Sequence, residues 1–435
     1  MRAGITGPGP GRRGAIRLTL GLIGSLARPL AAQAPAAAPG LPSAEPGSSL
    51  TIAVMTMGIG AYPWERFGHN AIVVEDRARG TRVSYNYGMF SFRQENFLLR
   101  FVQGRMWYWV DSVDTDWDVP RYLAAHRSVW WQELNLTPAQ RVALRDFLEW
   151  NVREEHRFYR YDYYRDNCST RVRDALDRVL GGAIKARTDT VRTGVSYRFH
   201  TQRLNSHDPL LYTGLLLAVG RGGDREITAW EEMFLPLKLR DHLRLIEVPD
   251  SAGRPVPLVR AERTIYLSDT YREPDAPPDW VPAYLAIGIV LGGLMAVPSR
   301  FGGDRGPAPA GLALPRYAFL AVAGSWCLLA GLAGVVLAGL WAFTDHTIAA
   351  RNENLFQLTP LALALVPLLA RGLAGHDRWL RGARRLAQAV AVLSGLGLVT
   401  HFVPGLSQGN AEILALAVPA NVGLWLGVEG WVGRR

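Results

Sequence analysis

Residues 161–182 read YDYYRDNCSTRVRDALDRVLGG, and this stretch decides how the chain is interpreted. Apolar residues recur at helical spacing after Cys168, which predicts an amphipathic helix. Asp166 or Asn167 can cap the start of that helix, and Gly181 can supply the left-handed residue that ends it. The sequence therefore predicts a helix with a cysteine at its N-terminus.

Cys168 stands where a cysteine can act as a nucleophile. Free backbone N–H groups and the helix dipole favour a thiolate at a helix N-terminus, and Arg165 and Arg171 add positive potential. The same N–H groups can stabilise an oxyanion. The alternative is a small buried cysteine with only a structural role. A nearby base would favour the catalytic interpretation.

His69 is the best candidate for that base among the nine histidines. The residues Ala71–Glu75 are short and rich in β-branched side chains, which predicts a strand with His69 at its entrance. Leu50–Met57 alternates in the same way and is expected to pair nearby. The alternative for a lone histidine is a structural residue of the core or surface.

A third strand is expected at Arg82–Tyr87, and a hairpin would bring one of its polar residues close to His69. Asn86 and Tyr85 are both candidates to orient the imidazole, as the third member of a triad does. They point to opposite faces of the strand, and the residues alone do not decide which face His69 uses. Zinc binding by His69 and Cys168 is a competing use, but no second cysteine or spaced histidine pair accompanies them.

The composition divides the chain into unlike parts. The 435 residues include two cysteines, carry a net charge of +10 and have a mean hydropathy of +0.03, which excludes a disordered polymer and a disulfide scaffold. Five long apolar segments all follow residue 279 and are expected to span a membrane: Trp280–Val297, Tyr317–Phe343, Leu355–Ala370, Leu386–Val403 and Ile413–Val432. The expected division is a signal or anchor with an Ala/Pro-rich linker at 1–49, an exported domain at 50–269, a linker at 270–279 and a transmembrane domain at 280–435.

Arginines orient these segments. The loops after the first and third segments and the C-terminus are rich in arginine, whereas the loops after the second and fourth hold one and none. Positive loops stay in the cytoplasm, so residues 50–269 are expected on the opposite face. Arg12 and Arg13 before the apolar run Leu18–Leu26 are typical of a signal peptide, with an uncleaved anchor as the alternative. No basic cluster with interleaved aromatic residues favours nucleic-acid binding.

Thr137 and Gln140 predict a further helix with a capping box, so the exported domain is expected to be α+β.

Several blocks of the sequence carry a family resemblance. They are residues 64–71 (WERFGHNA), 85–92 (YNYGMFSF), 134–138 (LNLTP), 161–171 (YDYYRDNCSTR) and 234–236 (FLP). These blocks resemble the periplasmic domain of the Lnb-type bacterial lipoprotein N-acyltransferases. The C-terminal segments, with Asp345-His346 and residues 352–354 (NEN), are similar to the membrane half of that family.

The resemblance implies an α+β, circularly permuted papain-like domain of the NlpC and lecithin–retinol acyltransferase kind. An all-α transmembrane domain of about five helices would follow it. The resemblance also implies Cys168 as the nucleophile and His69 as its base, and no cofactor or metal. The protein would lie in the bacterial inner membrane with its catalytic domain on the periplasmic face.

The implied reaction moves a fatty acyl chain from a phospholipid, through a thioester on Cys168, to the N-terminal amine of a lipoprotein. His346, Asn352 and Asn354 are predicted near the outward ends of the spans and are expected to bind lipid head groups. Two alternatives remain open. One is a cell-wall cysteine amidase or peptidase with the same dyad, and the other is a non-catalytic membrane receptor or assembly protein.

Overall fold

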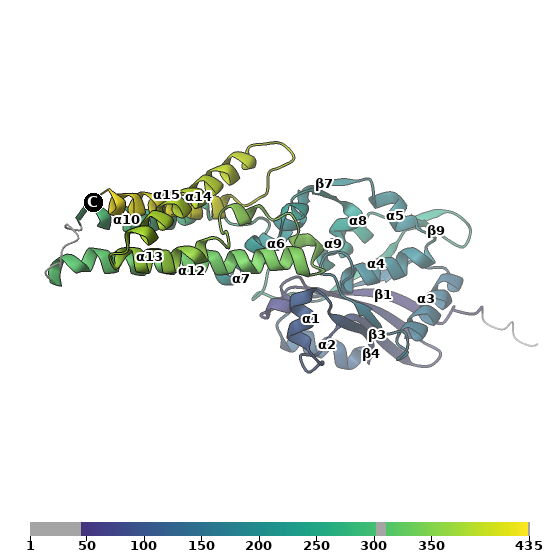
Figure 1. Cartoon of the computed structure of the whole chain (residues 1–435). Helices are drawn as coiled ribbons and strands as arrows, with labels where there is room; N and C mark the ends of the chain where they lie inside the picture. Colours follow the sequence, from purple (N-terminus) through teal and green to yellow (C-terminus); the bar gives the residue numbers. More distant parts are fainter. Residues whose placement is uncertain (1–44, 302–309, 434–435) are drawn as a thin grey trace, which may run out of the picture. The chain divides into compact units, whose positions relative to one another are not determined.

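The computed structural model describes residues 45–301 and 310–433 of the chain (Figure 1). The predicted signal peptide, with Arg12, Arg13 and the run Leu18–Leu26, lies outside the described residues. The residues from Glu45 onward belong to one structural unit.

A seven-stranded antiparallel sheet organises the first part of this unit. Its strand order is β11-β5-β1-β2-β3-β4-β6. The three strands predicted from alternation are neighbours within it: β1 (Leu50–Met57), β2 (His69–Asp76) and β3 (Thr81–Met89). The other four are β4 (Trp107–Asp114), β5 (Val129–Leu134), β6 (Phe158–Arg160) and β11 (Val259–Tyr266).

Helices pack on both faces of the sheet, because alternate side chains of β1 and β2 point to opposite sides. On one face, Ile52 and Ile72 pack with α3 (Pro138–Asn151) and α4 (Cys168–Val179). On the other face, Ala71 belongs to a cluster that packs against α2 (Thr115–Ala124). The sheet therefore separates α4 from α2, and this separation decides which side chains can meet at its edge.

The predicted helix starts are present. Thr137 caps α3 and shares a capping box with Gln140, and Asn167 caps α4. The remaining elements of this part are α1 (Phe97–Gln103), α5 (Ala183–Thr188), α6 (Tyr197–Leu204), α7 (Pro209–Ala218), α8 (Ala229–Glu232), α9 (Pro236–Leu243), β7 (Arg192–Ser196), β8 (Glu226–Thr228), β9 (Glu247–Pro249), β10 (Pro255–Pro257) and the short turns η1 (Pro63–Glu65) and η2 (Arg221–Gly223).

The part after residue 280 is helical. Each predicted apolar segment contains a helix, and the elements are α10 (Val281–Ala296), α11 (Pro298–Phe301), α12 (Ala310–Phe343), η3 (Thr347–Ala349), η4 (Glu353–Phe356), α13 (Ala362–Leu373), α14 (Asp377–His401) and α15 (Ala411–Val432). Among the described residues, three helices are long and apolar enough to cross a membrane, and they lie in Val281–Arg300, Leu314–Phe343 and Ala411–Val432.

The other two predicted segments differ from expectation for separate reasons. Leu355 falls in the η4 turn, so α13 begins only at Ala362 and is too short to span a bilayer by itself. Helix α14 is long, but its first half carries Arg378, Arg381, Arg384 and Arg385, which the sequence had placed in a loop. The arginine-rich connection is therefore mostly helix.

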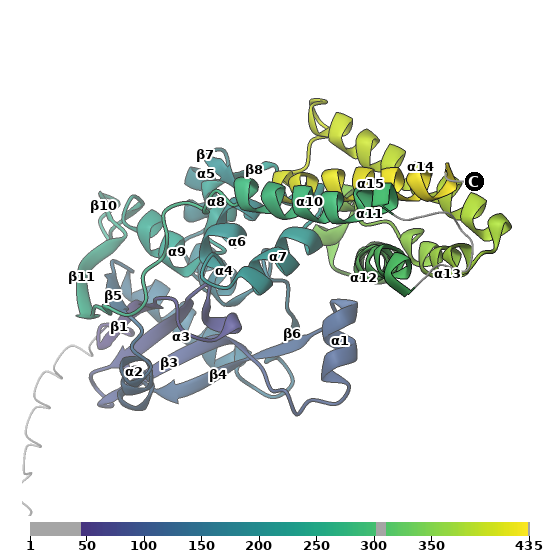
Figure 2. The same ribbon diagram turned by 90° about the vertical axis from the view of Figure 1, so that its left-hand side faces the viewer.

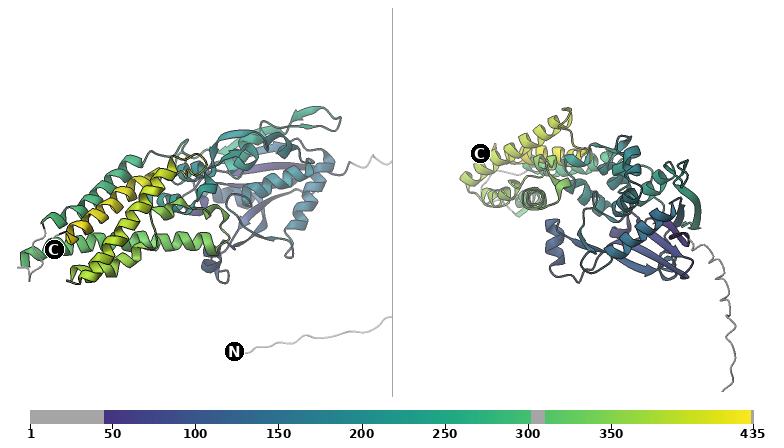
Figure 3. Two further views of the ribbon diagram at one scale, coloured as in Figure 1. Left: turned by 45° about the horizontal axis from the view of Figure 1, so that its top comes forward. Right: turned by 90° about the vertical axis from the view of Figure 1, so that its right-hand side faces the viewer.

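Helices α10 and α15 lie side by side because glycine lets their backbones approach (Figure 3). A Cβ atom added to Gly288 would lie 2.5 Å from the carbonyl oxygen of Leu416, and one added to Gly292 would lie 2.4 Å from that of Pro419. Two glycines four residues apart are a familiar contact between membrane helices. A side chain at either position would force the two helices apart.

The sheet-containing part and the C-terminal helices have separate apolar clusters, and α7 belongs to the second. Tyr212 and Leu216 of α7 belong to the apolar cluster formed by the C-terminal helices. The Tyr212 hydroxyl donates to Glu412 Oε1 at 2.7 Å. Helix α7 therefore joins the sheet-containing part to the membrane helices.

Candidate active site

The start of α4 is held by a dense set of hydrogen bonds. The Asn167 side-chain oxygen accepts from the backbone N–H groups of Ser169 and Thr170, both at 2.9 Å. Its amide nitrogen donates to the carbonyl of Phe234 at 2.9 Å, and Ser169 Oγ donates to the carbonyl of Met233 at 2.7 Å. The first turn of α4 is therefore tied to the 234–236 block, and the position of Cys168 is fixed with it.

Cys168 is the first residue of α4, and its sulfur approaches the edge of the sheet. The backbone N–H groups of Asn70, Ser169 and Cys168 itself face the sulfur and favour its charged form. Because Asn70 directly follows His69, the sulfur lies against the entrance of β2. Gly88 borders it on β3, where an added Cβ would lie 3.2 Å from Cys168 Cβ. Glycine at 88, with a φ of +85°, keeps space open beside the thiol.

Burial decides the resting state of this thiol. The side chain of Cys168 is only 8% exposed, and burial raises its pKa to about 11, which outweighs the nearby N–H groups and the charge of Arg127. The helix start was expected to favour a thiolate. The structure corrects that expectation, because desolvation disfavours the charged form by more than the dipoles favour it. Cys168 rests as a neutral thiol at neutral pH.

His69 is the first residue of β2 and faces α2. Its ring stacks near Tyr122, with ring centroids 6.3 Å apart, and its Nε2 lies 3.0 Å from Asn86 Oδ1. Burial, with a smaller contribution from the charge of Arg127, lowers the pKa of His69 to about 4, against the opposing effect of the hydrogen bond to Asn86. The imidazole is therefore neutral at pH 7. In the described structure its ring is hydrogen-bonded to Asn86 rather than to the thiol, and such contacts often tighten only when substrate binds.

Asn86 continues as a chain of hydrogen bonds to α2. Its amide nitrogen donates to Asp118 Oδ2 at 3.0 Å. An ionised carboxylate only accepts, so the Asn86 nitrogen faces Asp118 and its oxygen faces His69. The hydrogen of the imidazole is then on Nε2, which leaves the lone pair of Nδ1 free to act as a base.

Asp118 was not identified from the sequence. It is 1% exposed, and burial raises its pKa, while Asn86 and Arg121 favour its charged form. The sequence feature that could have identified Asp118 is the acidic run at residues 114–118. Asp114 caps α2 in this run, and further carboxylates follow in the first turn. Pro120 interrupts the helical pattern there, so α2 itself was not predicted.

Arg127 is a second residue that the sequence did not single out. It is buried, donates from Nε to the carbonyl of Gly58 at 2.9 Å, and lies over the Tyr122 ring. Its Nη2 is buried without a hydrogen-bond partner among the described residues. Its charge lowers the pKa of both His69 and Cys168, so it belongs to the same site.

The structure brings Asn86, and not Tyr85, to the imidazole. Asn86 lies opposite Ala71 in the register of β2 and β3, on the face that His69 shares. Tyr85 points to the other face and packs in the cluster with α3 and α4. Burial raises the pKa of Tyr85 to about 12.

The polar residues predicted to bind head groups have other contacts. Asn352 and Asn354 are buried, and their amide nitrogens both donate to the carbonyl of Leu217, at 2.6 and 3.2 Å. The last carbonyls of a helix need donors from elsewhere, and these two side chains supply them for α7. The two asparagines are therefore not open to a lipid head group. The His346 ring lies 2.9 Å from the carbonyl oxygen of Phe101, at the end of α1.

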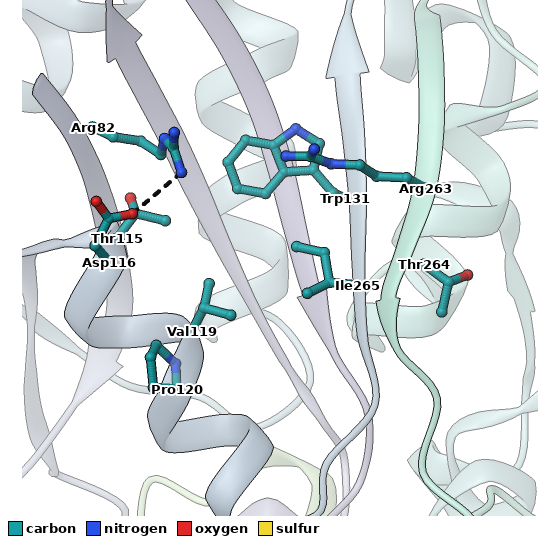
Figure 4. A pocket seen from close by; sticks show the side chains of 9 residues that line it. All are labelled: Arg82, Thr115, Asp116, Val119, Pro120, Trp131, Arg263, Thr264 and Ile265. Atoms are coloured by element: carbon teal, nitrogen blue, oxygen red, sulfur yellow. Dashed lines mark hydrogen bonds and ion pairs between the residues drawn. The ribbon is translucent and has the colours of Figure 1, made fainter. Parts of the chain in front are cut away.

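A separate pocket opens on the α2 side of the sheet (Figure 4). It is lined by Arg82, Thr115, Asp116, Val119, Pro120, Trp131, Arg263, Thr264 and Ile265. Arg82 pairs with Asp116 at 3.2 Å, and neither His69 nor Cys168 lines this pocket. Within the described ranges, no group of three or more His, Cys, Asp or Glu side chains is arranged to hold a metal ion.

Two family models match the chain. The Lnb N-terminal periplasmic domain matches residues 44–198, which include His69, Asn86 and Cys168, and the Lnb transmembrane domain matches residues 316–396. Neither a curated protein nor a solved structure matches. The two family matches together cover more than half of the 435 residues. The chain therefore belongs to the Lnb-type family, as a membrane protein with a mixed α/β periplasmic domain.

Proposed function

We propose that this protein is a thiol-dependent N-acyltransferase of the bacterial inner membrane. It takes a fatty acyl chain from a phospholipid, holds it as a thioester on Cys168, and passes it to the N-terminal amine of a lipoprotein. One observation carries the proposal. The sulfur of a buried thiol at a helix start faces the backbone N–H of Asn70, and Asn70 directly follows His69, whose tautomer is set by Asn86 and Asp118.

In the first step, both partners begin neutral. Nδ1 of His69 takes the proton of the Cys168 thiol as the sulfur attacks the ester carbonyl carbon. The backbone N–H groups of Cys168 and Asn70 face the sulfur and stabilise the oxyanion. The carbon–oxygen bond then breaks, and the imidazolium returns its proton to the leaving lysophospholipid. A thioester remains on Cys168.

In the second step, the free α-amine of the lipoprotein attacks the thioester carbonyl. His69 removes a proton from the attacking nitrogen, the carbon–sulfur bond breaks, and an amide forms. The sulfur leaves as a thiolate and regains a proton from His69. The low pKa of His69 suits this shuttle, because the imidazole is free to accept a proton at the start of each step.

Asn86 and Asp118 act as positioning residues in this scheme. They hold the imidazole in the tautomer that presents Nδ1, as the third member of a catalytic triad does. The order of the chain also supports a permuted papain-like domain, because the histidine strand β2 precedes the cysteine helix α4.

Intact mass spectrometry of the full-length protein in phospholipid vesicles tests the nucleophile. We expect one acyl adduct, lost in Cys168→Ala and retained in Cys327→Ala. Cys327 is the matched control, because it is the other buried cysteine and lies in α12. An adduct that persists in Cys168→Ala would contradict the proposal.

The acceptor is tested in cells without another N-acyltransferase. We expect lipoproteins with a free N-terminal amine when Cys168 is replaced by Ala. Lipoproteins that stay N-acylated would refute amide transfer. Cleavage of peptidoglycan fragments by the wild-type protein, with no amide product, would instead favour a cell-wall amidase.

A further inference from the structure

Helix α1 exposes apolar side chains where a soluble domain would present polar ones. Its sequence is FLLRFVQ, and Leu98 is 76% exposed, with Leu99 and Val102 also exposed. Contiguous exposed apolar patches on a folded protein mark a surface that meets a partner or a membrane.

The patch extends beyond α1 through exposed aromatic rings. Tyr62 stacks on Trp64 in the η1 turn, with ring centroids 4.9 Å apart. Trp64 lies 5.4 Å from Phe92, and Phe92 lies 5.1 Å from Phe97 at the start of α1. Together, η1, Phe92 and α1 form one apolar surface, which we call the lip.

The contacts of α1 place the lip at the end of a candidate membrane span. The backbone N–H of Asp345, just beyond the end of α12, donates to the carbonyl of Gln103 at 2.8 Å. Arg105 and Arg160 both pair with the Asp345 carboxylate, at 2.9 and 2.7 Å. Helix α1 is thus fastened to the periplasmic end of a candidate membrane span (Figure 2). Phe343, the last residue of α12, is 83% exposed at that end.

A row of aromatic rings connects the lip to the thiol. Phe97 lies 6.2 Å from Phe90, Phe90 lies 5.0 Å from Tyr108, and Tyr108 stacks on Tyr161 at 4.1 Å. A Cβ atom on Gly88 would touch both Tyr161 and Cys168, at 3.6 and 3.2 Å. A continuous series of ring contacts therefore runs from the exposed helix to Tyr161, beside Cys168.

We propose that the lip inserts into the outer leaflet of the membrane and that the aromatic row receives the acyl chain of a phospholipid. The inference rests on the proposed function, because an acyl chain must leave the bilayer to reach Cys168. The occupant is a lipid because α1 sits at the end of a membrane span and Leu98, Leu99 and Phe92 carry no charge. The row would hold the chain while its ester bond lies at the thiol.

Insertion is measured without any acyl transfer. The chain has only two cysteines, so Cys168→Ala with Cys327→Ala gives a cysteine-free protein for spin labelling at Leu98→Cys. In phospholipid vesicles, we expect the label to be accessible to oxygen and shielded from a water-soluble nickel complex. A label at Leu245→Cys is the control, because Leu245 is 79% exposed in the loop after α9. Equal nickel access at both positions would refute insertion.

The functional consequence is measured separately. We expect Leu98→Glu to slow adduct formation on Cys168 by about tenfold in vesicles, because a charge opposes insertion. Leu98→Met should keep the wild-type rate, and so should the control Leu245→Glu. A wild-type rate in Leu98→Glu would overturn the inference and leave the proposed function intact. Insertion at Leu98 with no adduct on Cys168 in the wild-type protein would refute the proposed function and leave insertion standing.

Discussion

Two buried polar clusters of this protein differ in which side-chain atoms they leave without a hydrogen bond. One joins His69, Asn86 and Asp118, and the other places Asn352 and Asn354 at the end of α7. The first leaves a lone pair on Nδ1 of His69, the residue before Asn70, whose backbone N–H faces the Cys168 sulfur. The second uses its amide nitrogens on backbone carbonyls. A buried polar residue is therefore better evidence for chemistry when an atom of it remains available for reaction.

The largest expected effect falls on the first cluster. Replacing His69 by Ala removes the base, and we expect adduct formation on Cys168 to fall by about a thousandfold. The initial rate of acylation in vesicles measures this, with His126→Ala as the control, since His126 is exposed in the turn before β5. A rate within a fewfold of wild type would show that another group takes the thiol proton.

The pH dependence of acylation tests the protonation states of His69 and Cys168. The pKa of His69 lies at about 4 and that of Cys168 at about 11, so thiol and imidazole are both neutral between these values. We expect a rate that falls as pH drops toward 4, where the imidazole becomes protonated, and a plateau through neutral pH. A rate that rises steeply between pH 6 and 8 would show instead that the base titrates near the ordinary imidazole pKa.

A smaller effect is expected from Asp118→Asn. An asparagine can donate as well as accept, so the Asn86 amide can turn and present its nitrogen to His69. The imidazole would then carry its hydrogen on Nδ1, and we expect the acylation rate constant to fall by about a hundredfold with little change in KM. Asp116→Asn is the matched control on the same helix, where Asp116 is largely exposed. Equal effects of both substitutions would argue against the positioning role.

The smallest effect on activity is expected in the second cluster. Asn354→Ala removes a donor to the Leu217 carbonyl, which Asn352 still reaches, and takes from the buried Asn410 amide its acceptor at Asn354 Oδ1. We expect the free energy of unfolding to drop by about 1–3 kcal/mol. Acylation per folded molecule should stay at the wild-type rate. Thermal unfolding in detergent and the mass of the Cys168 adduct measure the two quantities. If Asn354→Ala leaves the stability unchanged but slows adduct formation from phospholipid, Asn354 binds the head group, as the sequence predicted.

Local signals predicted much of the fold around the thiol. Strand alternation placed β1, β2 and β3, and capping residues placed the starts of α3 and α4, because such signals lie within a few neighbouring residues. The resemblance to the Lnb-type family is confirmed by the two matching domains. The specific acyl transfer and the roles of the site residues stay proposals.

The features that the sequence did not predict depend on contacts between segments that are distant in the chain. Asp118 lies on a helix with an internal proline, and Arg127 reaches the site from a turn, so neither shows a local pattern. Burial decides the pKa of Cys168, and burial is a property of the folded chain. The hydrogen bonds of Asn352 and Asn354 to α7 also form only in the folded chain, so the position of these residues beside apolar segments did not predict them.

The protonated state of Cys168 has a consequence for how long the protein survives in its compartment. Oxidants attack thiolates far more readily than thiols, and the periplasm lacks the reducing pool that protects cytosolic cysteines. A thiol whose pKa burial raises to about 11 is almost never charged while it waits for substrate. In the proposed mechanism, the desolvation that makes a base necessary also protects the thiol of Cys168 from sulfenic acid formation.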